Sequence, residues 1–321
     1  MTAIQFQLRQ ATHSDLPEIA ALISEGLSFD GLAIVQTAEE LEEDWGGPYC
    51  FLDQDVMVAE HESHIIGVGY TYFLPSETKE ERCYALGTVK PTFRRKGVGT
   101  ELQQWTTTRA EKLLRSTNRT IPKFLRSDVS TSNTSADFLF KKFNMRPVRW
   151  NEDLIIDLNQ SPEVFVSPGY CVIPWDTSRD EEARVVKNLA FMDHWGSTPT
   201  SEEGWEQLVH GSTAKLDQSF FALDSNNNIV GLLLSHRYES DDETLGKRIG
   251  WIDKLATLSE HRGKAIGRSL ITHALAAYRR DGLTHAALDV DTENPTGAYG
   301  LYTAVGFSTF RGSVTYERIV Q

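Results

Sequence analysis

The stretch VKPTFRRKGVG, from Val89 to Gly99, returns later in the chain as TLSEHRGKAIG, from Thr257 to Gly267. Both copies follow an apolar, strand-like run, and both open a long helical pattern. They share the pattern Arg-x-x-Gly/Ala-x-Gly, and about half of the chain separates Arg94 in the first copy from Arg262 in the second. A repeated motif in matched surroundings predicts a duplicated domain.

A basic, glycine-containing turn at the start of a helix is suited to bind a phosphate group. Small residues let backbone N–H groups approach the anion, and the helix dipole adds partial positive charge. Neither copy matches a P-loop or a dinucleotide fingerprint. A loop that only caps a helix is the alternative, which duplication makes less favoured. The expected contacts to a phosphorylated cofactor are Val89, Arg94, Arg95, Lys96, Gly97, Val98 and Gly99 in the first copy, and Arg262, Gly263, Lys264, Ala265, Ile266, Gly267 and Arg268 in the second.

The duplication extends beyond the loop. Each half has an extended stretch that turns into a helix, two strand-like runs around a polar turn, and later a strand followed by an asparagine and a helix. A segment with two prolines, Asn159 to Gly169, separates the halves. We therefore predict two domains, 1–160 and 161–321. The matched segments are Leu8–Ala20 with Ile173–Arg184, Val56–Phe73 with Phe220–His236, and Phe124–Val129 with Ala286–Asp291.

Composition limits the classes of function. The net charge is −13 and the pI is about 5.2, which opposes nucleic-acid binding. No run approaches 18 apolar residues and the first residues show no signal pattern, so we expect a cytoplasmic protein that does not bind membranes. Cys50, Cys83 and Cys171 are widely spaced and predict free thiols. The two histidines in His61–His64 do not form a metal-binding motif, and no metal site is predicted.

Taken together, these motifs resemble those of the GNAT superfamily of acetyl-CoA-dependent N-acyltransferases. The resemblance rests on HRGKAIGRSL (His261 to Leu270) and LDVDTENPTGAYGLYTAVGF (Leu288 to Phe307), and on VKPTFRRKGVGTEL in the first half. It implies an α/β (α+β) fold of two tandem GNAT-like domains. Each would have a mixed, splayed central sheet with helices on both faces, and acetyl-CoA would be the co-substrate.

The resemblance also implies where the cofactor lies. The strands Gly250–Leu258 and Ala286–Asp291 would splay apart, and the pantetheine arm would pair like an added strand with the backbone of Leu255, Ala256 and Thr257. An unpaired amide there would stabilise the oxyanion of the thioester. Asn294, after the second strand, would also contact the cofactor. Ala265 stands where the family usually has glycine, and its methyl group would hinder the loop if that position needs a positive φ.

Tyr302 matches the family's general acid. Its phenol would protonate the departing thiolate, with help from geometry and the local field. A tyrosine packed under the cofactor is the alternative. Asp253, on the strand before the second loop, is the candidate base, acting directly or through water. Asp291 on the opposing strand is the second candidate and is also a candidate substrate contact, and a chain of waters could replace either.

Asp193 and Trp195 follow the first helix of the second half, a region that forms a wall of the acceptor site in this family. An aspartate would hold a cationic amine, and a tryptophan would stack on it. The alternative is a helix end with Gly196 as its cap and Trp195 in the core. His194 is expected to be a polar residue at the helix end.

The first half departs from this pattern. Alignment of its last helix places Phe140 opposite Tyr302, and the constant offset between the two loops places Ala85 opposite Asp253. We therefore predict an N-acetyltransferase with its chemistry in the second half, acting on a primary amine of a small molecule or peptide, as a monomer or homodimer. The rival interpretations are a non-catalytic acyl-CoA-binding or scaffold protein and a protein N-acetyltransferase.

Overall fold

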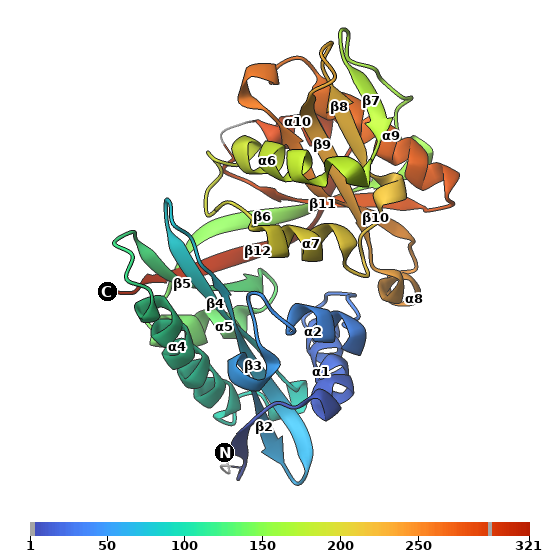
Figure 1. Ribbon diagram of the computed structural model, residues 1–321. Coiled ribbons are helices and arrows are strands. Elements are labelled where there is room, and N and C mark those ends of the chain that lie inside the picture. The colour runs from blue at the N-terminus through green and yellow to red at the C-terminus, as the bar shows by residue number, and fades with distance from the viewer. Residues whose placement is uncertain (1–3, 295–296) are drawn as a thin grey trace. The chain divides into compact units, whose positions relative to one another are not determined.

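The computed structural model describes residues 4–294 and 297–321, so Pro295 and Thr296 of the second-half motif lie outside the described residues (Figure 1). The chain divides into two units. Unit 1 comprises Met1–Trp150 and Ser313–Gln321, and unit 2 comprises Asn151–Gly312. Each unit is mixed α/β. Among the described residues, no helix has both the length and the apolar character needed to cross a bilayer.

Unit 1 has the strand order β1-β2-β3-β4-β5-β12, and only the β4–β5 pair is parallel. Helices α1 and α2 cover one face of this sheet, and α4 and α5 cover the other (Figure 1). Its elements are β1 (Gln7–Gln10), α1 (Leu16–Phe29), α2 (Ala38–Asp44), α3 (Leu52–Asp55), β2 (Val56–His61), β3 (His64–Leu74), β4 (Glu81–Val89), α4 (Val98–Ser116), β5 (Lys123–Ser130) and α5 (Thr134–Lys142), with parts of β6 (Arg146–Asp157) and β12 (Ser308–Ile319).

Unit 2 repeats this plan with the order β6-β11-β10-β9-β8-β7, in which only β10–β11 is parallel. Helices α6 and α7 lie on one face, and α9 and α10 on the other. Besides residues 151–157 of β6 and 308–312 of β12, its elements are β7 (Cys171–Pro174), α6 (Asp180–Ala190), α7 (Glu202–His210), β8 (Phe220–Leu223), β9 (Ile229–Arg237), α8 (Asp242–Leu245), β10 (Ile249–Thr257), α9 (Ile266–Arg280), β11 (His285–Asp291) and α10 (Ala298–Val305).

Local sequence explains the central elements of unit 2. Helix α9 buries Ile266, Leu270, Ala274 and Tyr278, which recur at every fourth position and form one apolar face against the sheet. Strand β9 is buried along its whole length because helices cover both faces of the sheet. The same arrangement in unit 1 places α4 against β3 and β4. The last glycine of each repeated loop faces apolar side chains: Gly99 lies near Val89 and Leu139, and Gly267 lies near Leu301 and Leu255.

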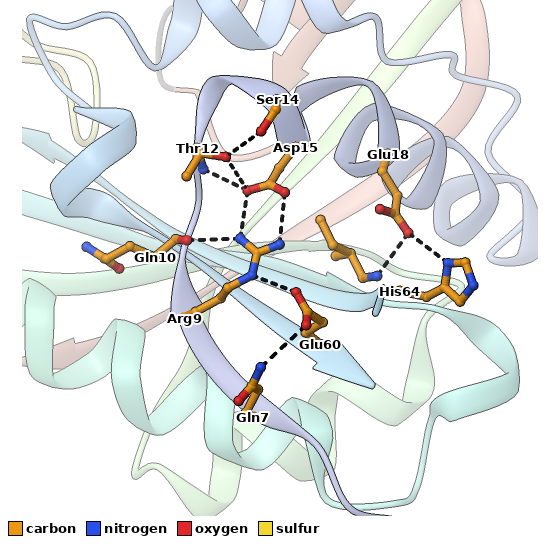
Figure 2. Close-up of polar contacts among 10 residues, drawn as sticks. Gln7, Arg9, Gln10, Thr12, Ser14, Asp15, Glu18, Glu60 and His64 are labelled. Carbon is orange, nitrogen blue, oxygen red and sulfur yellow. Dashed lines mark hydrogen bonds and ion pairs between the residues drawn. The ribbon is translucent and has the colours of Figure 1, made fainter. Parts of the chain in front are cut away.

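The entry into α1 is fixed by charged residues (Figure 2). Arg9 donates to both oxygens of Asp15 at 2.7 and 2.9 Å, and its Nε donates to Glu60 on β2 at 2.7 Å. The hydrogen bond from Arg9 lowers the pKa of the Asp15 carboxyl to about 2. These contacts join β1 and β2 to Asp15, the N-cap of α1, so the helix begins at a fixed position on the sheet.

One contact of Figure 2 recurs in unit 2 and relates the two units residue by residue. The Glu18 carboxylate on α1 accepts a hydrogen bond from the backbone N–H of Ile65 on β3 at 2.9 Å. Glu182 on α6 accepts from the N–H of Ile229 on β9 at 2.8 Å. Donor and acceptor are equally far apart along the chain in the two pairs, so α1 corresponds to α6 and β3 to β9 at one common offset. The duplication thus includes side-chain contacts as well as the order of elements.

The greater part of the last strand, Ser313–Ile319 of β12, belongs to unit 1. Residues Ser313–Ile319 of β12 pair antiparallel with β5, and Arg126 on β5 lies directly opposite Glu317. The buried Arg126 guanidinium donates to Glu317 at 2.8 and 2.9 Å and to Glu80 at 2.7 Å. In unit 2 the corresponding place beside β11 is taken by residues 151–157 of β6. Residues 151–157, from the first half of the sequence, therefore complete the strands of unit 2, and residues 313–319, from the second half, complete those of unit 1. The domain boundary at residue 160 stays a prediction.

Candidate functional site

The parallel strands of unit 2 separate before their ends. β10 and β11 pair from Ile249 with His285 to Ile252 with Leu288, and there the pairing stops. Leu255, Ala256 and Thr257 continue to pair with β9 on the other side of β10. Among the described residues, no strand pairs with their second edge, which is where an extended ligand could pair with backbone groups.

The loop after β10 has the shape of an anion site. Gly263 and Ala265 both adopt left-handed backbone, with φ of +74° and +58°, and Ala265 caps the N-terminus of α9. The amides of the first turn, beginning at Ile266, have no partners within the helix and add the positive end of its dipole. Position 265 thus needs the positive φ that alanine disfavours, yet the loop forms with the methyl group in place.

Arg262 uses its donors within the protein. Its Nε donates to the Thr257 carbonyl at 3.2 Å, and its Nη2 donates to the carbonyl of Ala190, the last residue of α6, at 2.7 Å. The guanidinium therefore ties the loop to β10 and to a helix end. Lys264 and Arg268 remain exposed at the loop, where they supply its positive charge.

Unit 1 builds the same loop from different residues. Arg95 and Gly97 have φ of +63° and +96°, and Gly97 caps α4. Arg94 donates to the Val89 carbonyl at 3.1 Å and the Gly26 carbonyl at 3.4 Å, as Arg262 does to Thr257 and Ala190. Here the guanidinium also makes a bidentate pair with Asp30, at 2.6 and 3.0 Å.

The strands of unit 1 separate in the same way, and a cavity follows the gap. β4 and β5 pair from Glu81 with Lys123 to Tyr84 with Arg126, and the pairing then ends. A cavity of about 710 Å³ begins at the loop, passes between the strands and reaches α1. Val89, Val98 and Gly99 lie at or beside this loop, and Asn133 lines the cavity where α5 begins.

Tyr302 is a buried residue of α10, only 8% exposed. Its hydroxyl makes no hydrogen bond to any of the described residues, and its ring packs edge-on against Phe307 with centroids 6.2 Å apart. Burial, with a smaller contribution from the negative charge of Asp289, raises the pKa of the phenol. The hydroxyl is thus protonated at neutral pH.

The position of Tyr302 in unit 1 is Phe140, as the sequence predicts. The N–H of Phe307 donates to the Tyr302 carbonyl at 3.1 Å, and the N–H of Met145 donates to the Phe140 carbonyl at 3.0 Å. A residue with left-handed backbone follows each helix, just before the donor: Gly306 before Phe307, and Asn144 before Met145. The two rings therefore occupy equivalent places, and only one carries a hydroxyl group.

Asp253 has no counterpart in unit 1. On β10 a bulge lies between Ile252, paired with Ser235, and Lys254, paired with Leu234, and Asp253 is the extra residue. On β4 the corresponding pairs run from Ala85 with Thr71 to Leu86 with Tyr70 without interruption. Ala85 therefore matches Ile252, and the alignment of Ala85 with Asp253 by constant offset is wrong. A bulge inserts one residue and redirects its side chain, which a constant offset does not register.

The Asp253 carboxylate is surrounded by basic groups. Lys254 Nζ lies 2.9 Å from Oδ2, and His236 Nε2 lies 4.0 Å from the same oxygen. Burial opposes ionisation of Asp253, but Lys254, with His236 and Lys187 on α6, lowers the pKa of its carboxyl below the usual value. Burial also lowers the pKa of His236, so that ring is neutral at pH 7.

The remaining candidates lie in the turns after α6 and at the end of β11. Asp193 and Trp195 are in the turns after α6, whose last residue before the cap is Ala190. Trp195 is 36% exposed, so it is not in the core, and the helix cap is Phe191 rather than Gly196. Asp291 ends β11, where its side chain accepts the N–H of Glu293 at 2.9 Å and its carbonyl accepts the N–H of Asn294 at 3.1 Å.

Sequence reasoning missed two lysines and one aspartate near these groups. Lys254 follows Asp253 and Lys187 lies on α6, and both act on the Asp253 carboxylate. Asp289 lies on β11 close enough to Tyr302 to affect its pKa. A period-2 count along β11 would have found Asp289, but Lys187 is distant from Asp253 along the chain and is brought near it only by the fold.

The repeated loop, the separated parallel strands and the open strand edge define a class of acyl-group transferases. The model of the Acetyltransferase (GNAT) family matches residues 25–145 and 187–307, three quarters of the chain. The chain belongs to this family, as the resemblance predicts, and contains two copies of its domain.

Curated relatives are distant. The chain is 27% identical to a mycothiol acetyltransferase from Salinispora arenicola over 241 residues, 72% of this chain and 71% of that protein. It is 28% identical to the mycothiol acetyltransferase of Thermobispora bispora over 163 residues, which are 49% of this chain and about half, 52%, of that protein.

Solved structures show the same tandem fold. A GCN5-related N-acetyltransferase from Sphaerobacter thermophilus superposes with a TM-score of 0.76 at 24% identity, covering 98% of this chain and 96% of that one. A tandem GNAT protein from the clavulanic acid biosynthesis pathway gives a TM-score of 0.71 at 14% identity, covering 99% of both chains. The predicted fold of two GNAT-like domains is therefore confirmed.

Proposed function

We propose that the protein transfers an acetyl group from acetyl-CoA to a primary amine of a small molecule or peptide, with the chemistry in unit 2. The observation that carries this proposal is the difference between matched sites. Both units have the anion loop and the separated strands, but only unit 2 has a hydroxyl group at the Tyr302 position and a carboxylate on a β-bulge. Unit 1 would bind a CoA thioester without turnover.

The loop and the open strand edge of the second unit fit the cofactor. The loop amides from Ile266 onward, with Lys264 and Arg268 beside them, would bind the diphosphate. The free edge of Leu255–Thr257 would pair with the pantetheine arm, as an added strand would. An amide of this edge pointing into the gap would stabilise the negative charge that develops on the thioester oxygen.

The reaction is a direct transfer. The neutral amine nitrogen attacks the thioester carbonyl carbon, an N–C bond forms, and the C–S bond breaks. The Tyr302 hydroxyl donates its proton to the departing sulfur. The pKa of the CoA thiol is lower than that of the phenol, so this transfer depends on the position of the hydroxyl next to the sulfur as negative charge develops there. Tyr302 then regains a proton from solvent.

Asp253 would handle the proton on the amine. Its pKa is lowered, so the carboxylate is ionised at neutral pH and is a weak base. It therefore suits a role in which it orients the amine or a bridging water and passes the proton on to solvent. Asp291 is the second candidate for this role, and Asp193 and Trp195 would contact the acceptor.

The acceptor itself is the open part of the proposal. Two relatives are named mycothiol acetyltransferases, so a mycothiol-type amine belongs in any panel of acceptors. At 27–28% identity these relatives do not define the acceptor. Amino acids, aminoglycosides and peptides complete the panel, and we propose that the reaction takes place in the cytoplasm.

The test is incubation with acetyl-CoA and each amine, followed by mass spectrometry of the products. An acetylated amine from the native protein, reduced at least tenfold by Asp253→Asn, supports the proposal. Because the Asp253 pKa lies below its usual value, the rate between pH 5 and 9 should rise with deprotonation of the amine, with no step from Asp253. Acetyl-CoA binding without product from any amine class would favour the rival interpretation, a non-catalytic acyl-CoA-binding protein.

A further inference from the structure

The cavity of unit 1 continues beyond the place where a thioester would lie. At one end it is lined by the loop residues Arg95, Gly97 and Gly99, and it passes the backbone of β4 where this strand leaves β5. Beyond that point it opens onto α1 and β3. We call this second part the apolar chamber, which is lined by Ile23, Leu27, Leu32, Tyr70 and Leu86.

The contacts shared by the two units identify the matching residues of unit 2. The pairs Glu18 with Glu182 and Gly26 with Ala190 relate α1 to α6 at one constant offset, so Ile23 corresponds to Lys187. Strand pairing relates Leu86, opposite Tyr70, to Lys254, opposite Leu234.

Two lysines of unit 2 are therefore replaced by isoleucine and leucine in unit 1. Lys254 pairs with Asp253, and the absence of the bulge from β4 removes that carboxylate from unit 1 as well. The acceptor side of unit 2 carries charge at both positions, whereas the same side of unit 1 presents hydrocarbon. An apolar wall around a cavity favours an apolar ligand group.

Polar residues also line the cavity, and its two carboxylates, Asp30 and Asp128, already have partners within the protein. Asp30 is occupied by Arg94 and by Asn133 Nδ2 at 2.9 Å. Asp128 accepts the Thr315 hydroxyl at 2.6 Å, and burial raises the pKa of its carboxyl in spite of the neighbouring Arg126 and Arg82. The Tyr70 ring packs against Trp45 at 5.1 Å and adds aromatic surface.

We propose that unit 1 binds acyl-CoA molecules whose acyl group is longer than acetyl, with the acyl carbons against Ile23, Leu27 and Leu86. The inference rests on the proposed function, because the loop of unit 1 must hold the CoA diphosphate. Phe140 offers no proton and no residue corresponds to Asp253, so the ligand stays bound without transfer. Unit 1 is thus a site for a second acyl-CoA class, distinct from the substrate of unit 2.

The test is calorimetric titration of the full chain with CoA, acetyl-CoA, butyryl-CoA and hexanoyl-CoA. Gly97→Glu, which places a carboxylate in the loop, identifies the binding that belongs to unit 1. An added Cβ meets no other atom within 4 Å there, but the φ of +96° strains any side chain, so circular dichroism must first show that the variant is folded. For that binding we expect affinity to rise roughly fourfold with each added methylene until the chamber is full, which is the equilibrium equivalent of about 0.8 kcal/mol per buried CH₂.

Substitutions copied from unit 2 make the test specific. Leu86→Lys and Ile23→Lys should abolish the dependence of affinity on acyl chain length and leave acetyl-CoA affinity within about twofold. Leu86→Met, which keeps the site apolar, should preserve that dependence. Leu86→Phe, which fills the chamber without a charge, should shorten the longest acyl group that gains affinity and serves if the lysine variants do not fold.

Two failures can be told apart. If binding that is lost in Gly97→Glu has the same affinity for acetyl-CoA and hexanoyl-CoA, the apolar chamber does not select acyl groups and the inference is wrong, while cofactor binding by unit 1 stands. If no binding is lost in Gly97→Glu, unit 1 has no CoA site, and the proposed role of its loop fails first.

Discussion

Units 1 and 2 share nearly the same backbone around their separated parallel strands, with different side chains upon it. In each, an arginine after the strand, Arg94 or Arg262, donates to the last strand carbonyl and to the end of the first helix. In each, two parallel strands separate after a short paired stretch of equal length. The units differ where protons would move, at Tyr302 and Phe140 and at the Asp253 bulge. The architecture that binds a cofactor can therefore persist without the groups that would use it.

The two loops show that backbone shape is kept more strictly than residue type. Both have left-handed residues at the same two places, but glycine occupies the second place in unit 1, Gly97, and the first place in unit 2, Gly263. The other place is Arg95 or Ala265. The surrounding contacts, chiefly those of the arginine, hold the loop in a conformation that its sequence only half favours.

The largest expected effect concerns the difference at the acid position. Tyr302→Phe should lower kcat by about 10²–10⁴-fold, the usual contribution of a positioned proton donor, and leave acetyl-CoA affinity unchanged. Phe140→Tyr is the matched change in unit 1 and should not add activity, because the bulge carboxylate is still missing there. Steady-state kinetics with single-turnover controls measures both. An unchanged kcat with chemistry rate-limiting would make Tyr302 a packing residue.

The next effect concerns the strands that complete the two sheets. In unit 1 the facing pair is Arg126 and Glu317, and in unit 2 it is Ala287 and Ile155. Glu317→Ala leaves a buried guanidinium with one of its partners gone and should destabilise the protein by about 3–5 kcal/mol. Ile155→Ala removes part of a half-buried side chain and should cost about 1–2 kcal/mol. Urea unfolding measures the free energy of unfolding of both variants. Equal losses would show that the buried ion pair contributes no more to stability than the apolar contact of Ile155.

A smaller effect should separate the two loops by function. Lys96 and Lys264 occupy the same place, so Lys96→Glu and Lys264→Glu introduce the same charge reversal into each unit. Lys264→Glu should lower kcat/KM for acetyl-CoA about 10-fold or more, since a charge near the diphosphate is worth a few kcal/mol at most near the surface. Lys96→Glu should leave turnover within about twofold. Loss of activity from Lys96→Glu in a folded protein would overturn the division of labour.

The smallest effect tests the exchanged glycines. Ala265→Gly relieves a left-handed alanine and should stabilise the protein by about 1 kcal/mol, and Gly97→Ala should destabilise it by a similar amount. Opposite signs in thermal unfolding, with far-ultraviolet circular dichroism unchanged, would confirm that the two loops share one backbone shape. The same sign for both would show that the loops differ in solution.

Sequence alone predicted the features that depend on neighbouring residues. Local patterns and fixed spacing predict the repeated loop, the helices that start at Val98 and Ile266, and the hairpins. They also predict the contrast of Tyr302 with Phe140. The family follows from the same residues and is confirmed by the match over both halves. These signals survive because a turn, a cap or an amphipathic helix is encoded within a short stretch of chain.

Tertiary structure decided what depends on the pairing of distant segments. The exchange of final strands, the single residue inserted at Asp253 and the approach of Lys187 to that carboxylate appear only when strand register is fixed. Arg94 and Arg262 also look alike as phosphate ligands in sequence, but the fold directs them to helix-end carbonyls. Local patterns state which residues can form a strand, whereas the partner of that strand, and the face each side chain takes, is set by packing across the whole unit.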